Sequence, residues 1–334
     1  MAASVYESFD GTPFDASKAK GKTVYYIPLI YKASYFPLVT ASLEAALQRA
    51  GATLHMCDGG GTPTGIASCM NQAVAGSAAG VITDYIPYEM VPTSYDALTA
   101  KGIPVYLSAS LAPNDQPNTA QIAYGSPDPT GFASVELAAD SIISSSDAQA
   151  ELILLKVATS AGIERTADHA ESYLEKTCPS CEVHTITVTS ANRDKVASLI
   201  SSTLLKYPSS TYVLVQTETY LNDVISGIST SGRTGKVKIA TASAALAGLQ
   251  KLETDPDLLV DVGLNPAYIA WGDADAILRM IAGEVPPSDY PAAVRAFTPE
   301  NVGSLELTDE AAKGPDWFGT PTYEDSFVKL WGLS

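Results

Sequence analysis

The sequence predicts an α/β protein built from two doubly wound parallel-sheet lobes. At 334 residues the chain is longer than one hydrophobic core usually supports, so two domains are expected. Apolar runs of strand length alternate with stretches of helical periodicity, an order that predicts right-handed βαβ units and a parallel sheet. The same alternation begins again near residue 151, so one chain carries two such sheets in succession.

The first lobe begins at the apolar run 23–29, which has the uninterrupted hydrophobicity of a strand buried in a parallel sheet. Segment 36–51 follows with leucines at roughly helical spacing, and Gly51 marks its end. The other elements expected in this half are strands at 53–57, 80–83 and 104–107 and helices at 66–75 and 94–101. Residues 1–21 are polar, and we expect them to form a leader arm.

The second lobe starts with a helix at 130–144 that leads into 151–157, a strand as apolar as the first. The later expected elements are helices at 163–176, 192–206, 220–229 and 268–282 and strands at 182–188, 211–215, 236–240 and 259–264. The last residues have weak periodicity and several aromatic side chains. We expect 311–334 to pack over the lobes as a C-terminal extension.

Composition and charge exclude several classes of partner. The chain carries 20 Lys and Arg against 37 Asp and Glu, a net charge of -17, which disfavours nucleic acid and anionic lipid surfaces. No window reaches the roughly 20 apolar residues of a membrane span. The N-terminus also lacks the apolar region of a signal peptide. This leaves either a cytoplasmic protein or a mature exported domain whose targeting segment is absent.

The four cysteines favour an oxidising compartment. Cys178 and Cys181 form a CxxC that follows a helix, whereas redox-active pairs begin one, and no second CxxC or histidine pair accompanies it to make a zinc site. We therefore predict a structural Cys178–Cys181 disulfide and a second one, Cys57–Cys69, that joins a strand end to the next helix. Two local pairings are typical of exported proteins.

Motifs for catalysis, cofactors or metals are weak. The loop 58–62 is glycine-rich, but it lacks the lysine and hydroxyl of a phosphate loop and is interpreted as a turn. Asp168 and His169 are adjacent without a nucleophile elbow and are interpreted as solvated helix residues. The acidic stretch 255–257 lacks calcium-loop spacing. We expect no catalytic residue, cofactor or metal. Tyr35 and Phe36 differ, because aromatic rings just after a strand lie where open α/β sheets bind ligands, although core or surface packing is an equal alternative.

The chain resembles the type I periplasmic binding proteins of the ribose-binding kind, whose fold also occurs in sensor domains of lactose-repressor-like regulators. The resemblance spans residues 22–290 and rests on the order and spacing of four segments: 24–29 followed by Tyr35 and Phe36, 101–105, 159–165, and 264–266. It implies two lobes joined by a three-segment hinge, with crossovers near 124–128, 264–266 and 290–297. The implied domains are 22–124 plus 265–292 and 125–264 plus 293–310.

The resemblance also implies where a ligand is held, namely a cleft between the lobes. The ligand contacts that it implies are Lys32, Tyr35, Phe36, Thr83, Asp84, Ser108, Ser110, Arg165, Thr217, Glu218, Ser243 and Asn265. Tyr35 and Phe36 match the stacking aromatics, and Arg165 matches an arginine that reaches into the cleft. Ser108 and Ser243 stand where sugar binders of this kind carry carboxylates. This departure disfavours an ordinary pentose or hexose and favours a less hydroxylated solute, with an anionic group facing Arg165 and Lys32 as one hypothesis.

The function implied is an extracytoplasmic receptor of an ABC importer, with a small-molecule ligand and a membrane permease as partners. A monomer is expected, and any membrane attachment would occur through a removed signal or a lipid anchor. Two alternatives stay open. One is a ligand-sensing domain that feeds a signalling protein, although residues 1–21 are too short for a helix-turn-helix. The other is an enzyme on the same scaffold, since fold does not dictate function.

Overall fold

The chain forms two compact α/β units in a computed structural model that describes residues 11–32, 35–158, 161–189, 191–290, 294–313 and 316–333. Described residues up to Pro129, from Asn265 to Tyr290 and from Lys313 onward form the N-terminal unit. Those from Thr130 to Leu264 and from Val294 to Ala312 form the central unit. Residues 1–10 of the expected leader arm, 159–160 of the quoted segment, 291–293 of the third crossover, and 314, 315 and 334 of the extension lie outside the described residues.

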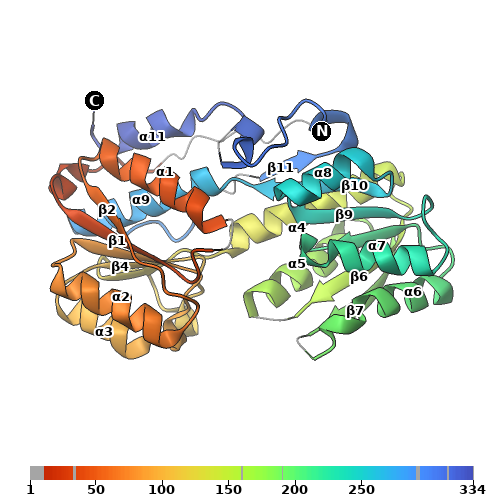
Figure 1. Cartoon of the computed structure of the whole chain (residues 1–334), viewed down its shortest axis with the longest axis horizontal. Coiled ribbons are helices and arrows are strands. Elements are labelled where there is room, and N and C mark those ends of the chain that lie inside the picture. The colour runs from red at the N-terminus through yellow and green to blue at the C-terminus, as the bar shows by residue number, and fades with distance from the viewer. Residues whose placement is uncertain are drawn as a thin grey trace. The chain divides into compact units, whose positions relative to one another are not determined.

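The N-terminal unit is a parallel sheet of five strands in the order β2-β1-β3-β4-β5. Helices cover both of its faces, with α1 and α9 on one side and α2 and α3 on the other (Figure 1). Its elements are β1 (Thr23–Pro28), α1 (Tyr35–Arg49), β2 (Thr53–Met56), α2 (Pro63–Ala75), β3 (Gly80–Asp84), α3 (Pro92–Ala100), β4 (Val105–Ser108), β5 (Ile122–Tyr124), α9 (Pro266–Ala282) and α11 (Tyr323–Leu330), with short 3-10 helices η1 (Ala16–Ala19), η2 (Tyr88–Met90), η3 (Pro113–Asp115) and η7 (Asp316–Phe318).

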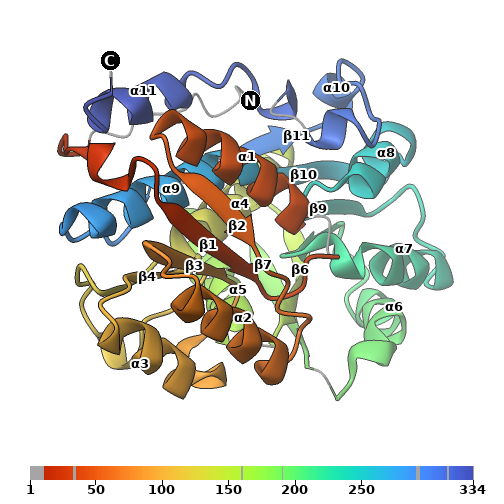
Figure 2. The same cartoon turned by 60° about the vertical axis from the view of Figure 1, so that its left-hand side comes forward.

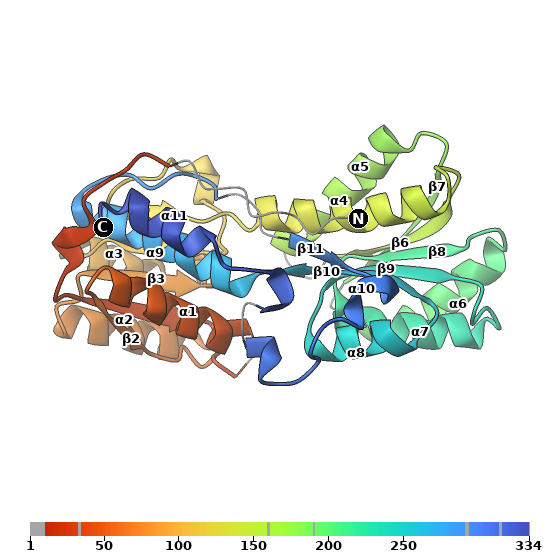
Figure 3. The same ribbon diagram turned by 90° about the horizontal axis from the view of Figure 1, so that it is seen from above.

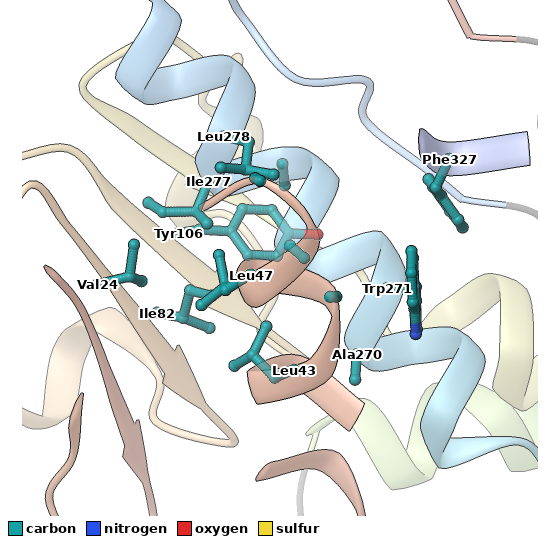
Figure 4. Close-up of a cluster of buried hydrophobic side chains, with 14 of the residues drawn as sticks. Val24, Leu43, Leu47, Ile82, Tyr106, Ala270, Trp271, Ile277, Leu278 and Phe327 are labelled. Carbon is teal, nitrogen blue, oxygen red and sulfur yellow. The ribbon is translucent and has the colours of Figure 1, made fainter. Parts of the chain in front are cut away.

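One apolar layer of this unit lies between the sheet, α1 and α9. Figure 4 shows side chains from the strands (Val24 and Ile82), from α1 (Leu43 and Leu47) and from α9 (Ile277 and Leu278) near one another, while Trp271 of α9 lies beside Phe327. Phe14, Ala16 and Ala19 belong to the same core, so residues 11–21 are a structural part of the unit instead of a polar leader arm. Backbone hydrogen bonds hold this segment against the C-terminal segment, since Phe14 N and Ala16 N donate to the carbonyls of Leu330 and Trp331.

The C-terminal segment is anchored to α9 of the N-terminal unit. Trp331 stacks on Trp271 with ring centroids 5.4 Å apart, and its indole Nε1 donates to Asp275 Oδ1 at 2.9 Å. The other carboxylate oxygen of Asp275 accepts from Arg279 Nε at 2.7 Å and from the Tyr290 hydroxyl at 2.8 Å. A buried carboxylate is stable here because a cation and several donors surround it.

The central unit holds a six-stranded sheet in the order β11-β10-β9-β8-β6-β7, in which β11 alone among these pairings runs antiparallel. Helices α4 and α5 lie on one face and α6, α7 and α8 on the other (Figure 3). Its elements are α4 (Asp128–Ser145), β6 (Glu151–Val157), α5 (Ala161–Thr177), β7 (Glu182–Val188), η4 (Arg193–Lys195), α6 (Val196–Lys206), β8 (Tyr212–Val215), η5 (Glu218–Tyr220), α7 (Leu221–Thr230), β9 (Lys238–Ser243), α8 (Leu246–Thr254), β10 (Leu258–Leu264), β11 (Val294–Phe297), α10 (Pro299–Val302) and η6 (Ala311–Lys313). The short helix α10 packs beside α8 and β10 (Figure 2).

The predicted fold class is confirmed, and the differences fall on short or late elements. The sequence reasoning missed β5, α8, β11 and α11, which are too short for a clear period or pair in an unexpected direction. β11 occupies the second half of the segment 290–297, which was expected as the third crossover. Both disulfides are present, Cys57–Cys69 and Cys178–Cys181, as predicted.

Candidate functional site

Three aromatic rings gather at the carboxyl edge of the N-terminal sheet. Tyr35 and Phe36 open α1 directly after the loop that follows β1, and Tyr85 follows the last residue of β3. The ring centroids lie 5.3 Å apart for Tyr35–Phe36, 5.7 Å for Tyr35–Tyr85 and 6.0 Å for Phe36–Tyr85, all edge to face. This arrangement is favourable because the positive edge of one ring meets the negative face of the next.

Tyr85 was not among the predicted contacts, yet it is the most accessible ring of this aromatic cluster. Its side chain is 45% exposed and its φ is 58°, a value that is uncommon for a residue other than glycine. The Tyr85 amide donates to the carbonyl of Ser108 on the neighbouring strand at 3.2 Å, which holds the turn. Ile30, after β1, is also 40% exposed at this edge. An aromatic residue directly after a buried strand was the signal that could have found Tyr85.

The polar residues predicted at this edge turn inward. Thr83, Asp84, Ser108 and Ser110 are all buried. The Thr83 hydroxyl lies 3.0 Å from the Tyr95 hydroxyl, and the Ser110 hydroxyl donates to the carbonyls of Ile86 and Ser108. These four residues are therefore not exposed contacts in this unit, because their partners lie within the fold.

Two carboxyl groups are buried together beneath the aromatic cluster. The Tyr26 hydroxyl donates to Asp84 Oδ2 at 2.7 Å, and the Ser108 hydroxyl donates to Asp273 Oδ1 on α9 at 2.9 Å. The second oxygen of each aspartate is buried without a hydrogen-bond partner. Burial raises the pKa of Asp84 to about 7. Burial and the negative charge of Asp84 raise the pKa of Asp273 well above its usual range, so the pair holds at least one proton near neutral pH.

Two predicted residues of this unit remain, Lys32 and Asn265. Lys32 is exposed in the loop after β1. Asn265 is buried at the start of α9, where its side-chain oxygen accepts from the amides of Ala267 at 3.0 Å and Tyr268 at 3.4 Å. This hydrogen bonding satisfies the free amides of the first helical turn, so Asn265 is an N-cap.

In the central unit, a buried glutamine organises the carboxyl end of β6. Gln216 follows β8, and its side-chain oxygen accepts from Val157 N at 2.8 Å while its nitrogen donates to the Ile163 carbonyl at 2.6 Å. These bonds tie the end of one strand to the first turn of α5. Arg165 stands in that first turn and is exposed, as a binding role requires. Gln216 was missed because a lone glutamine after a strand has no distinctive pattern.

Thr217, Glu218 and Ser243 are brought together at the carboxyl ends of β8 and β9. The hydroxyls of Thr217 and Ser243 lie 3.4 Å apart. The carboxylate of Glu218 accepts from Ala245 N at 3.1 Å and is partly buried. Burial raises the pKa of Glu218. The predicted contacts Thr217, Glu218 and Ser243 therefore form one polar group at these strand ends.

Other titratable groups of the central unit are paired locally. His169 stacks on Phe132 with centroids 4.0 Å apart, its Nε2 lies 2.7 Å from Glu136 Oε1, and the neighbouring Asp168 forms an ion pair with Lys156. Both lie on α5, where Asp168 is exposed, as predicted, and His169 is partly buried; each also contacts a side chain on the adjacent element.

Three residues near the amino ends of β6 and β7 are of the types that ligate metal ions. Glu151, Glu182 and His184 place one ligand atom each within 4.8 Å of one another. His184 stacks on Tyr207, however, and its Nε2 lies 3.1 Å from Glu151 Oε1, which also accepts from Ser210. The geometry is that of a histidine in hydrogen-bond contact with a carboxylate.

Solved structures of the same architecture cover most of the chain. The sugar-binding protein of a sugar ABC transporter from Bacillus halodurans matches with a TM-score of 0.72 and 15% identity over 85% of this chain and 100% of that chain. The 5-methylthioribose transporter solute-binding protein from Thermotoga lettingae, in complex with 5-methylthioribose, matches with 0.67 and 14% over 96% and 99%. The chain has the fold of the periplasmic solute-binding proteins.

A third solute-binding protein of this fold, an ABC transporter periplasmic protein from Actinobacillus succinogenes with bound D-allose, matches with a TM-score of 0.69 and 10% identity over 85% of this chain and 100% of that chain. No protein-family model matches the sequence, and no curated protein matches it. Among the described residues, no helix is long and apolar enough to span a membrane.

Proposed function

We propose that this protein is the extracytoplasmic solute-binding receptor of an ABC importer and binds one small sugar-like or carboxylated organic solute. The observation that supports this proposal most is the likeness to solute-binding proteins whose structures hold 5-methylthioribose and D-allose, over 96% and 85% of the chain. Two disulfides in 334 residues support an oxidising compartment. The permease of the importer is the proposed partner, and the protein is proposed to act as a monomer, held at the membrane by a lipid anchor or free of it.

The chemistry of the N-terminal edge supports a solute with an apolar face. Tyr85, Tyr35 and Phe36 offer ring surface there, and Ile30 adds an exposed aliphatic group. Sugar hydroxyls need charged or polar partners, but Asp84 and Ser108 at this edge are buried and engaged inside the fold. We infer that this unit contacts a ring face, an alkyl group or a thioether in preference to a row of hydroxyls.

The central unit carries polar side chains at its own strand ends. Arg165 presents a guanidinium, which donates a fork of hydrogen bonds to a carboxylate or a hydroxyl pair. At the carboxyl ends of β8 and β9, the hydroxyls of Thr217 and Ser243 lie 3.4 Å apart and can donate or accept. These groups of the central unit suit a ligand with a carboxylate or a short set of hydroxyls.

Mass spectrometry of whatever copurifies with the protein is the first test. Thermal shift and calorimetry against neutral hexoses, alkylthio- or aryl-substituted sugars, polyols and small organic acids then rank the classes. We expect substituted sugars or acids to stabilise the protein and unmodified hexoses to act weakly. Tight binding of a neutral hexose would overturn the proposed ligand class, and no stabilisation by any small solute would overturn the receptor function.

Variants of Arg165 test its role with the solute so identified. Arg165→Ala is expected to weaken binding by about 2–5 kcal/mol if the guanidinium pairs with a buried anion, and Arg165→Lys should restore part of the loss. Lys176→Ala, an exposed substitution on the same helix, is the matched control. Equal affinity of wild type and Arg165→Ala would show that the arginine does not contact the solute.

A further inference from the structure

The turn that ends β9 has an unusual backbone conformation without any glycine. Ser243 has a φ of 133° and Ala244 a φ of 47°, both in the region that residues with a Cβ seldom adopt. Such conformations cost about 1–3 kcal/mol each and persist only where their surroundings hold them. This turn carries the Ser243 hydroxyl, which lies 3.4 Å from that of Thr217.

Two carboxyl groups hold the amides of this turn. Ala244 N donates to Asp261 Oδ1 at 2.9 Å, and Ala245 N donates to Glu218 Oε2 at 3.1 Å. Asp261 lies on β10 and is fully buried, whereas Glu218 opens η5 after β8. The turn on β9 is thus fixed from both neighbouring segments by hydrogen bonds to carboxyl oxygens.

The two carboxyl groups also face one another above a single glycine. A Cβ placed on Gly248 of α8 would lie 2.1 Å from Glu218 Oε2 and 2.7 Å from Asp261 Oδ2. Both oxygens therefore occupy the space that a side chain at this position would fill. Asp261 Oδ2 is buried and has no hydrogen-bond partner among the described groups. Two carboxyl oxygens in such a place attract one another only when one of them carries a proton.

The electrostatics agree with this geometry. Burial raises the pKa of Asp261 well above its usual range, and the negative charge of Glu218 raises it further. Burial also raises the pKa of Glu218. A proton held on Asp261 would donate to Glu218 and supply the missing partner of Oδ2.

We propose that Glu218 and Asp261 share one proton and act as a clasp that holds the Ser243–Ala244 turn, which makes them positioning residues for the Ser243 and Thr217 hydroxyls. The consequence for solute binding rests on the proposed function, whereas the clasp itself does not. Loss of the shared proton leaves two buried negative charges in contact, so the clasp opens as the pH rises through the raised pKa of the pair.

Three charged side chains on the neighbouring elements bear on this pH dependence. On β11, Arg295 pairs with Gly263 and so shares the face of Asp261, and its guanidinium lies over the ring of Phe297. On α8, Lys251 follows Gly248 by one helical turn and is partly buried. On α10, Glu300 is exposed. Burial and the charge of Glu218 raise the pKa of Asp261, and they set how high the pH must rise before the clasp opens.

Backbone hydrogen exchange of the turn, followed by mass spectrometry of peptides that span residues 241–250, tests the clasp without any solute. In the wild type we expect protection of Ala244 and Ala245 to fall by about tenfold or more between about pH 6 and about pH 9, after correction for intrinsic exchange. Asp261→Asn replaces the shared proton with a permanent amide donor and should keep the protection at both pH values. Asp261→Ala should lose it at both.

Gly248→Ala tests the same clasp without touching a titratable group. The new methyl group displaces Glu218, so protection should be lost at both pH values. Gly303→Ala is the matched control, because a Cβ there meets nothing within 4 Å. Far-UV circular dichroism of each variant separates local opening from failure to fold.

The outcomes separate the clasp from the receptor function. Protection in Gly248→Ala equal to that of the wild type, a wild-type turn insensitive to pH, or Asp261→Asn behaving as Asp261→Ala would each overturn the clasp. None of these results depends on a solute. A solute panel in which nothing binds would overturn the receptor function and leave the exchange data unchanged.

Discussion

Replacing Asp84 by asparagine is expected to stabilise the N-terminal unit at neutral and alkaline pH. Asp84 is fully buried, and the Tyr26 hydroxyl donates to its Oδ2 at 2.7 Å. An asparagine side chain keeps an oxygen to accept that bond and places an uncharged nitrogen where Oδ1 lies without a partner. The substitution therefore removes a buried negative charge while it preserves the shape of the site.

The magnitude follows from the pKa of Asp84, which burial raises from 3.8 to about 7. Between these values the folded protein holds a proton that the unfolded chain has released. Stability contributed by this group is therefore fully present below about pH 4 and is lost as the pH rises to about 7. At 1.36 kcal/mol per pH unit the loss is roughly 4 kcal/mol in total, and asparagine avoids it. Tyr26→Phe removes the hydrogen bond that opposes the shift and should extend the loss to higher pH.

Urea unfolding followed by tryptophan fluorescence reports on this unit selectively, because Trp271, Trp317 and Trp331 are the three tryptophans of the chain and all lie in it. We expect wild type and Asp84→Asn to be similar near pH 4, and the variant to be more stable by about 2–4 kcal/mol near pH 8. Asp309→Asn, an exposed substitution in the central unit, is the control. Parallel stability curves for wild type and Asp84→Asn from pH 4 to pH 8 would refute the reasoning.

Three further predictions concern the extension, the disulfides and the aromatic edge. Phe327→Ala removes a fully buried ring that packs against Trp331, and it should lower the free energy of unfolding by about 3–5 kcal/mol in the tryptophan-monitored assay. A loss below about 1 kcal/mol would mean that the extension is not part of the core. Cys57→Ser breaks the disulfide to Cys69, 12 residues away, and should lower the free energy of unfolding by about 3 kcal/mol in the same assay. Thiol labelling should then detect the free Cys69. Thiols that already react in the wild type would contradict the pairing. Tyr85→Ala should lower the affinity for the copurified solute. The free energy of unfolding should change by about 0.5 kcal/mol or less, because Tyr85 is 45% exposed. Unchanged affinity would remove Tyr85 from the site.

The aromatic and hydroxyl contacts show how far pattern reasoning reaches. Tyr35 and Phe36 could be predicted because they follow the first strand, and their contact in space follows from adjacency in sequence. Tyr85 joins them from another strand end, which requires knowledge that β1 and β3 are neighbours. A sequence does not state which strands pair, so such a group is found only once the sheet order is known.

The buried acidic residues show why roles are harder to predict than positions. Asp84, Ser108 and Glu218 do stand at strand ends, as expected. Ser108 nevertheless donates to Asp273, which is 165 residues away on α9, and Glu218 faces Asp261 on β10. A polar side chain at a strand end turns inward or outward according to the partners that distant segments offer, and these partners are not encoded locally.

By itself, the sequence determined the α/β class, the doubled series of elements and the two disulfides, because periodicity, helix stops and short-range cysteine pairing are local properties of the chain. Only the tertiary structure decided that residues 11–21 and the C-terminal segment complete one core, that β11 pairs antiparallel with β10, and that two acid pairs lie buried beneath the strand ends. These features depend on contacts between segments far apart in sequence, where burial and the available hydrogen-bond partners set the charge and the role of each side chain.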